Sequence, residues 1–370
     1  MIDIITDYIL PFLVIMSLLV FVHELGHYFV ARRNGVRVEV FSIGFGLELF
    51  GWSAKNGTRW KICAIPLGGY VKMFGDDKSI DGISYTEEDR REAFYYKSPN
   101  ARAGIVIAGP VANLIFAILV LSFLYMWVGQ SFAPAVVANV IKNSPADRAG
   151  IMSGDTILSV NGKKIINFSD LRRIIIEQPG KLVMLVIKRN GATYNVPVTT
   201  EIVVDLDSSG NKKSLGRIGI QSNHMLFDKL NPLKAVMLAI TTTFSIIVQT
   251  FEAIGEMLIG MRSTDELGGP LRIAELSGTV THNGLITTMW FTAVLSINLG
   301  LINMLPIPIL DGSHLIFYAL ESIRGRPLSP QVYEWASVIG MSIIVILMLF
   351  VTWKDLIRLN VSSYLSSLIK

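Results

Sequence analysis

Near the amino terminus, residues 8–31 read YILPFLVIMSLLVFVHELGHYFVA. A bilayer core about 30 Å thick needs about 20 apolar residues in a helix, so this run is long enough to cross one. Three ionisable residues, His23, Glu24 and His27, interrupt it. An ionisable side chain inside a span costs about 2.5–3.5 kcal/mol on insertion scales, so we expect these three to serve a function.

The composition of the whole chain is that of a membrane protein. Of 370 residues, 51% are apolar and 17% charged, and the mean hydropathy is +0.50, which is too apolar for an ordinary soluble protein. Lysine and arginine are scattered beside apolar runs, so we expect no nucleic-acid binding. Residues 103–128, 285–310 and 335–353 contain no charge and have the length of a span. We predict a polytopic α-helical membrane protein with about four transmembrane helices.

Basic residues predict how the spans are oriented. Three arginines within residues 32–37 follow the first span. By the positive-inside rule they place residues 32–102 in the cytoplasm and the amino terminus outside. Arg324 and Arg326, between the last two spans, fall in the cytoplasm on the same scheme. Residues 129–284 are then expected on the outer side.

Residues 130–222 are charged and rich in turn signals, and they predict a soluble α+β insert. The expected elements are strands at 136–141, 156–160, 181–189 and 192–198, and a helix capped by Ser169. The stretch SPADRAGIMSGDTILSVNGKKI at residues 144–165 resembles the core of a bacterial PDZ domain. That resemblance implies a groove for a peptide carboxyl terminus, with residues 216–220 as a nest of backbone amides. The alternative is a spacer or steric filter that binds no peptide.

Residues 23–27, HELGH, form the pattern HExxH. Residues four apart share one face of a helix, so both imidazoles can bind one zinc ion while Glu24 lies beside it without binding. The chemistry expected of such a site is hydrolysis of a peptide bond by water, with the glutamate as acid and base. The alternative is a structural cluster of polar residues between helices.

A catalytic zinc site needs a third protein ligand and a position for water. Asp311 is the candidate, at the end of an uncharged span and behind Pro306 and Pro308, which break a helix. A broken helix inside a bilayer is tolerated where protein or a water-filled cavity satisfies the freed backbone groups, so a polar site can form there. His314 would close the coordination sphere and exclude water, so we leave it out of the predicted ligands.

One further apolar segment, residues 235–251, is short and rich in threonine. If it crossed the membrane, the next span would reverse, and Asp311 would lie at the face opposite His23 and His27. A shared site needs these residues at one depth. We therefore predict that residues 234–261 form an amphipathic helix on the outer surface.

With HELGH in the first span, NMLPIPILDG at residues 303–312 and a PDZ insert between them, the chain resembles the site-2 protease family of intramembrane zinc metalloproteases. The resemblance covers nearly the whole chain. It is closest to the bacterial regulator of sigma-E protease group, and it includes AGPVAN at residues 108–113. Some members of that group carry two PDZ domains, whereas this chain has room for one.

The resemblance implies one zinc ion per chain held by His23, His27 and Asp311, Glu24 as the catalytic residue, and Asn303 as a substrate-binding residue. It also implies a multi-pass protein of the bacterial inner membrane, with its PDZ domain in the periplasm. Substrates would be single-span membrane proteins, such as a pre-trimmed anti-sigma factor, or remnant signal peptides. The alternative function is a non-proteolytic membrane adaptor whose PDZ domain gathers partners.

Residues 44–46 and 65–73 are apolar, rich in glycine and predict strands. Similar segments of the family form β-structure that enters the membrane, where an added strand would hold an unwound substrate. The alternative is an ordinary cytoplasmic hairpin. The predicted division of the chain is a membrane catalytic region at 1–129 and 285–370, a PDZ domain at 130–222, and an outer-surface helix with its linker at 223–284.

Overall fold

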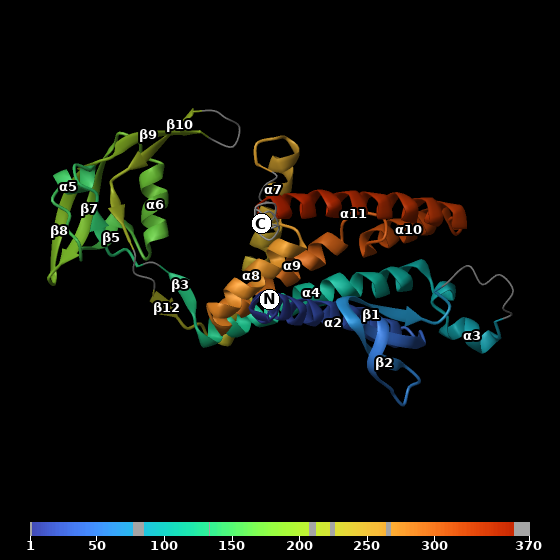
Figure 1. Ribbon diagram of the computed structural model, residues 1–370. Helices are drawn as coiled ribbons and strands as arrows, with labels where there is room; N and C mark the ends of the chain where they lie inside the picture. Colours follow the sequence, from blue (N-terminus) through green and yellow to red (C-terminus); the bar gives the residue numbers. More distant parts are fainter. Residues whose placement is uncertain are drawn as a thin grey trace, which may run out of the picture. The chain divides into compact units, whose positions relative to one another are not determined.

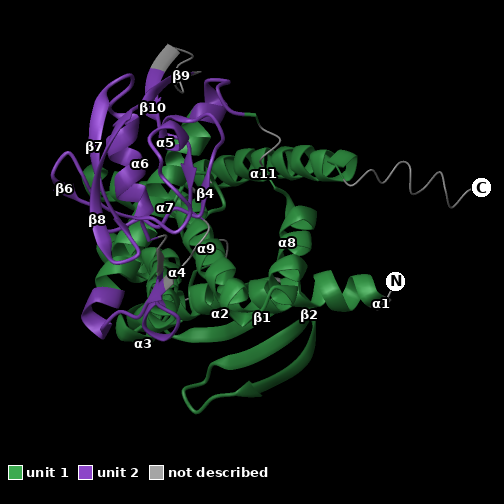
Figure 2. Ribbon diagram, turned by 90° about the vertical axis from the view of Figure 1, so that its left-hand side faces the viewer, with its two compact units in different colours: residues 1–124, 236–255, 263–370 green, residues 125–235, 256–262 purple. Residues whose placement is uncertain are grey.

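The structure is a computed structural model that describes residues 2–76, 85–132, 134–206, 212–222, 226–263 and 268–358. The chain forms two compact units, coloured separately in Figure 2. Unit 1 comprises residues 1–124, 236–255 and 263–370, and it holds the long helices and one hairpin. Unit 2 comprises residues 125–235 and 256–262, and it holds most of the short strands.

Long helices make up most of unit 1 (Figure 1). They are α2 (Leu10–Arg33), α4 (Pro99–Trp127), α7 (Pro232–Leu258), α8 (Pro270–His282), α9 (Leu285–Asn303), α10 (Asp311–Arg324) and α11 (Pro330–Arg358). Shorter elements are α1 (Ile2–Ile4), η1 (Ile5–Ile9), α3 (Glu87–Glu92) and η2 (Phe94–Tyr96). The strands β1 (Val38–Ser53) and β2 (Arg59–Met73) pair as an antiparallel hairpin.

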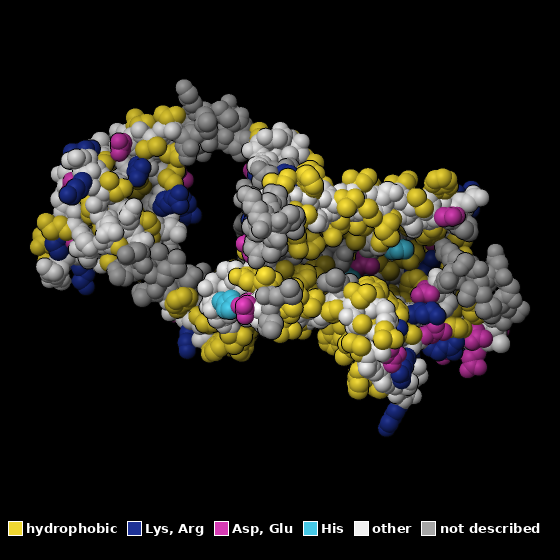
Figure 3. Space-filling model, viewed as in Figure 1, with side chains coloured by type: hydrophobic (Ala, Val, Ile, Leu, Met, Phe, Trp, Pro, Cys, Tyr) yellow, Lys and Arg dark blue, Asp and Glu magenta, His cyan; other side chains and the backbone are white. Residues whose placement is uncertain are grey.

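Five helices among the described residues are long and apolar enough to cross a membrane. Four of them correspond to the predicted spans, so the polytopic helical fold is confirmed, and Figure 3 shows apolar side chains covering the helices of unit 1. Helix α9 ends at Asn303, before the predicted limit of its span at residue 310, because prolines follow it. The fifth helix, α7, is the segment predicted to lie on the outer surface, and its length and composition also allow a crossing.

Helices α2, α4 and α9 approach one another through glycines. A Cβ atom added to Gly26 would lie 2.2 Å from the carbonyl oxygen of Ala108, and one added to Gly300 would lie 2.9 Å from that of Pro110. Both positions therefore have to stay glycine for the backbones to come this close. In a bilayer, such close contact replaces the hydrophobic effect as the force that holds helices together.

The β1–β2 hairpin confirms the strands predicted at residues 44–46 and 65–73 and extends well beyond them. Its base packs on α2 through aromatic rings, where Phe41 stacks on Trp60 and both contact Tyr28 edge-on. Beyond this base, apolar side chains such as Leu47 and Leu49 are exposed. The hairpin thus packs on the first span through its aromatic residues and exposes apolar side chains in the later half of β1.

Unit 2 has the PDZ-like arrangement that the sequence predicts. Its main sheet has the order β6-β5-β7-β8, and the helix α6 lies beside a buried core. The elements are β3 (Gln130–Phe132), β4 (Asn139–Val140), α5 (Pro145–Arg148), β5 (Thr156–Val160), β6 (Lys163–Lys164), α6 (Phe168–Ile176), β7 (Leu182–Arg189), β8 (Ala192–Thr199), β9 (Glu201–Leu206), β10 (Lys212–Arg217), β11 (Ile220–Gln221) and β12 (Leu226–Asp228). Three further pairs, β9 with β10, β4 with β11 and β3 with β12, are antiparallel.

One local prediction in unit 2 is wrong. The residue that caps α6 is Asn167, whose side chain accepts a hydrogen bond from the Asp170 amide at 2.8 Å, and Ser169 already lies in the first turn. The capping position needs extended backbone, which Asn167 has. The sequence analysis also missed the β9–β10 hairpin.

Asp155 and Arg189 form a two-pronged ion pair that links β5 to β7, with N–O distances of 2.6 and 2.7 Å. Burial raises the pKa of Asp155, but hydrogen bonds from Arg189 and the Met152 amide outweigh burial, so the pKa lies below its usual value. A carboxylate whose pKa is lower in the folded state stabilises the fold above its unfolded pKa of about 3.9, and this contribution is lost as the pH falls.

We expect Arg189→Met to destabilise unit 2 at neutral pH, because Asp155 is left buried without its guanidinium partner. The loss of stability relative to the wild type should shrink as the pH falls below about 4 and Asp155 becomes protonated. Hydrogen exchange of the β5 and β7 amides in the full-length protein, corrected for intrinsic exchange rates, measures this loss of stability. Arg173→Met is the control, since Arg173 is largely exposed in its pair with Asp170. Equal protection in both variants at neutral pH would contradict the prediction.

Candidate metal centre

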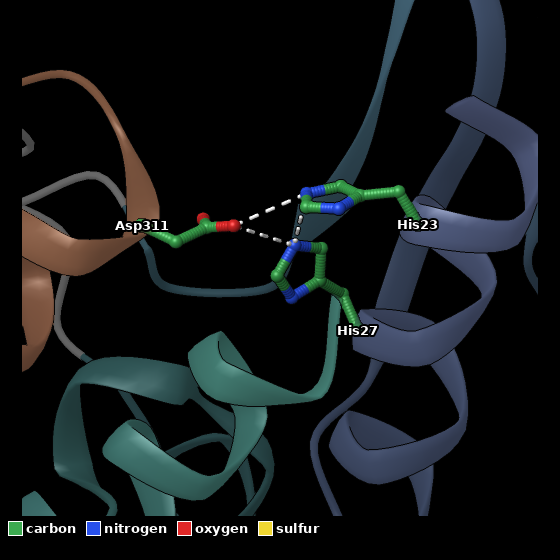
Figure 4. Close-up of side chains that lie close together, drawn as sticks. All are labelled: His23, His27 and Asp311. Carbon is green, nitrogen blue, oxygen red and sulfur yellow. Dashed lines mark hydrogen bonds and ion pairs between the residues drawn. The ribbon is translucent and has the colours of Figure 1, made fainter. Parts of the chain in front are cut away.

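His23 and His27 of α2 converge with Asp311, the first residue of α10 (Figure 4). The Asp311 Oδ2 atom lies 3.1 Å from His23 Nε2 and 3.6 Å from His27 Nε2, and the two Nε2 atoms are 3.2 Å apart. Tetrahedral zinc with bonds of about 2.0–2.1 Å places neighbouring ligand atoms about 3.3 Å apart. The three donor atoms therefore have the spacing of one face of a zinc tetrahedron.

The hydrogen bonds around these donors also fit a bound cation. His27 Nδ1 lies 2.9 Å from the carbonyl oxygen of Ile105, which can only accept, so Nδ1 donates its proton. In the neutral ring, Nε2 then presents a lone pair toward Asp311, whose Oδ2 is buried without a hydrogen-bond partner among the described residues. Two electron-pair donors that face one another are stabilised by a cation between them, so the residues present fit zinc.

The wall behind the histidines is the AGPVAN segment of α4. A Cβ atom on Gly109 would lie 2.3 Å from His27 Nε2 and 2.9 Å from His23 Cε1. Only a residue without a side chain lets α4 pass so close to both rings. This segment is part of the family resemblance seen in the sequence, and the structure shows the steric reason for its glycine.

A tight turn after α9 brings Asp311 to the histidines. Ile309 has φ of +86°, which a β-branched residue rarely adopts, and strain of this kind collects at functional sites. A Cβ atom on Gly312 would lie 2.3 Å from the Leu305 carbonyl oxygen, so the turn closes on itself here. The proline-rich segment thus ends one helix and starts the next with its carboxylate aimed at α2.

Glu24 and Asn303 share one cavity with the three donors. Its volume is about 690 Å³, and Figure 3 shows a recess between the helices with histidine and acidic side chains in it. Strand β2 passes close to Glu24, since a Cβ atom on Gly69 would lie 3.1 Å from the Glu24 Cγ atom. The structure therefore brings all five predicted site residues together. His314 also lines the cavity but is not grouped with the three donors.

An ion pair at the same cavity was missed by the sequence analysis. Arg102 of α4 and Glu321 of α10 lie 2.6 Å apart with side chains 4% and 10% exposed, and Tyr318 packs against the guanidinium. Arginine beside a span is a topology signal in sequence, so the buried partner could not be inferred. The pair joins α4 to α10 and neutralises the charge lining that part of the cavity.

Unit 2 contains a separate cavity of about 340 Å³ between α6 and residues 215–220. Its lining includes Leu171 and Ile175 of α6 and the predicted nest at residues 216–220. Gly219 has φ of +79°, and a Cβ there would lie 2.3 Å from the Ser144 Cβ. The groove has the position expected for a peptide, and its ligand stays a prediction.

We expect Gly109→Ala to abolish metal binding, because the new methyl group would displace both imidazole rings. Gly104→Ala on the same helix is the matched control, since nothing lies within 4 Å of a Cβ there. Zinc content of the purified full-length variants, measured by elemental analysis, separates the two. Equal zinc content in Gly109→Ala and Gly104→Ala would contradict the assignment of Gly109 as the residue that packs against both imidazole rings.

The sequence is similar to those of known zinc metalloproteases. The model of Peptidase family M50 matches residues 11–347. A protein of Rhizobium meliloti, provisionally named a zinc metalloprotease, is 40% identical over 361 residues, covering 95% of this chain and 96% of the relative. A protein of Agrobacterium fabrum with the same provisional name is 42% identical over the same length. The metalloprotease MmpA of Caulobacter vibrioides is 32% identical over 385 residues, covering 96% of this chain and 97% of the relative.

Among solved structures, the chain matches PDZ domains of SdrC-like proteins from two Listeria species. The one from Listeria innocua is 22% identical, with 26% of this chain and 99% of that chain covered and a TM-score of 0.20. The one from Listeria monocytogenes is 18% identical, with 25% and 90% covered and the same TM-score. The family model and the relatives, by contrast, span almost the whole sequence. The chain therefore belongs to Peptidase family M50, the site-2 protease family of zinc metalloproteases.

Proposed function

We propose that this protein is an intramembrane endopeptidase that hydrolyses peptide bonds within the transmembrane segments of single-span proteins. The observation that carries the proposal is the convergence of His23, His27 and Asp311 on one cavity inside a bundle of apolar helices. Glu24 faces the same cavity without belonging to the group of donors. Hydrolysis of a peptide bond at a metal needs both three ligands and a carboxylate that does not bind the metal. A purely structural site does not need that additional carboxylate.

Each residue has a role that follows from its chemistry. Zinc, when bound, would polarise the substrate carbonyl and ease the deprotonation of water. Glu24 can take up that proton and return it to the leaving amine, because its carboxylate lies one residue from His23 and lines the cavity. Asn303 can hold the substrate backbone, since its side chain offers both a donor and an acceptor.

The strand β2 can supply hydrogen-bond partners to an unwound substrate. A helix inside a bilayer satisfies its own backbone groups, so opening it for hydrolysis frees donors and acceptors that need new partners. Residues 68–71 of β2 line the cavity beside Glu24. A substrate segment added as a strand at this edge would recover those hydrogen bonds.

The directions of the helices support a position of α7 on the membrane surface. Later residues of α4 contact earlier residues of α2, with Gly109 against His27 and Asn113 near His23, so the two helices run in opposite directions. Helix α8, which ends just before α9 begins, packs on η1, just before α2. The end of α4 and the start of α9 thus lie on one side. The chain that connects α4 to α9 must therefore cross the membrane an even number of times. Among the described residues, α7 is the one helix of span length in this connection, so a crossing by α7 alone does not fit.

The proposal extends to the bacterial inner membrane, with the PDZ domain in the periplasm and the zinc centre nearer the cytoplasmic face. Substrates of this kind are single-span proteins already shortened by another protease, such as an anti-sigma factor, or remnant signal peptides. The groove of unit 2 is suited to a newly formed carboxyl terminus of such a protein.

The proposal is tested by cleavage of a tagged single-span substrate with full-length enzyme in liposomes, with zinc assayed in parallel. Glu24→Gln should keep about one zinc ion per chain and lose at least about 100-fold in cleavage rate. Asp311→Asn should lose both zinc and activity, because it weakens a ligand. Asn303→Ala should keep zinc and cleave more slowly. Undiminished cleavage by Glu24→Gln, or a wild type without zinc, would favour the adaptor function.

The position of α7 predicts that both of its ends react from the same side of the membrane. In a Cys63→Ala background, Leu233→Cys and Ile259→Cys should both react with a membrane-impermeant maleimide added outside. Lys55→Cys, between β1 and β2, should react only after the membrane is opened. Labelling of the two ends of α7 from opposite sides would show that it crosses.

A further inference from the structure

We infer that Asn113 is a positioning residue that holds His23 in the tautomer required for metal binding. The inference rests on the proposed metal centre and adds a residue to it. Asn113 belongs to the AGPVAN segment, and no role proposed above accounts for its polar side chain. It is completely buried in α4, where an amide without partners would be costly.

The two histidines are held differently. His27 has its Nδ1 proton fixed by the Ile105 carbonyl, a backbone group that can only accept. His23 Nδ1 instead faces the Asn113 side chain, 3.4 Å from its Nδ2 atom. Asn113 Oδ1 has no hydrogen-bond partner among the described residues. One ring is thus oriented by the backbone, and the other depends on a side chain that mutation can change.

The Asn113 amide can serve either tautomer of His23. Without metal, Nδ2 donates to a bare His23 Nδ1, and His23 Nε2 donates its proton to His27 Nε2 at 3.2 Å. Metal binding through Nε2 requires that proton to move to Nδ1, which then needs an acceptor. A half-turn about the Cβ–Cγ bond exchanges the nearly isosteric amide groups and places Oδ1 there. The rotation couples the histidine tautomer to metal binding.

Contacts with α9 keep Asn113 in place. The Ser296 hydroxyl donates to the Asn113 carbonyl oxygen at 2.8 Å, and a Cβ on Gly300 would lie 3.4 Å from the Asn113 Cβ. These contacts hold the backbone and leave the side-chain amide facing His23. Residues that orient a metal-bound imidazole in this way typically contribute 10- to 100-fold to metal affinity.

The test compares three side chains of similar shape in the full-length protein in detergent, with Co²⁺ alone as the probe. Asn113→Asp keeps the acceptor, whereas Asn113→Leu removes all hydrogen bonding. We expect Asn113→Leu to weaken cobalt binding by about 10- to 100-fold and Asn113→Asp to stay within about threefold of the wild type. The visible absorption of tetrahedral cobalt gives the affinity. Asn303→Leu, in the same cavity, should bind like the wild type.

Thermal unfolding of the metal-free variants identifies any that do not fold. If Asn113→Leu does not fold, Asn113→Asp decides, since affinity near that of the wild type supports the role. The inference is overturned if a folded Asn113→Leu binds cobalt as the wild type does, or if Asn113→Asp binds at least about tenfold more weakly than the wild type. Failure of the wild type and of Glu24→Gln to bind cobalt would instead overturn the metal centre itself.

Discussion

The close approach of α4 to α2 fixes the positions of the two histidines. In an apolar bundle, every polar group of an imidazole needs a partner supplied by the protein or by a bound ion. Gly26 and Gly109 remove the side chains that would keep the two helices apart. The Ile105 carbonyl can then reach His27, and the Asn113 amide can reach His23. Two small residues thereby make it possible to keep two histidines within a membrane span.

Asp311 adds a negative charge to this arrangement, and the turn that leads to it is strained. Prolines end α9 early, and the turn that follows forces Ile309 into a conformation that glycine would adopt more readily. Gly300 packs α9 on α4, and the Arg102–Glu321 pair joins α4 to α10. These contacts hold the ends of the strained turn. Asp311, the first residue of α10, thus lies where the short turn joins two packed helices, which suits a proposed metal ligand that must not move.

One cavity combines groups that are individually unfavourable inside a membrane. The three candidate metal ligands, the Glu24 side chain and the Arg102 guanidinium line a common cavity, where water can solvate them. The β1–β2 hairpin borders the same space with backbone groups. The proposed cleavage of transmembrane segments needs both conditions, since hydrolysis consumes water and an unwound substrate needs hydrogen-bond partners. Unit 2 contributes a groove of a different kind, which suits a peptide end in water.

The sequence was enough to predict the membrane class, the four charge-free or nearly charge-free spans, the HExxH helix and the carboxylate behind two prolines. Each of these signals is local: a run length, a helical spacing or a helix-breaking residue. It could not reveal the buried partner of Arg102, the cap at Asn167 in place of Ser169, or the role of Gly109. Those depend on distances between segments far apart in the chain. The tertiary structure was needed to show that α4 passes close enough to both histidines for Gly109 and Asn113 to lie against their rings, because side-chain volume matters only where backbones meet.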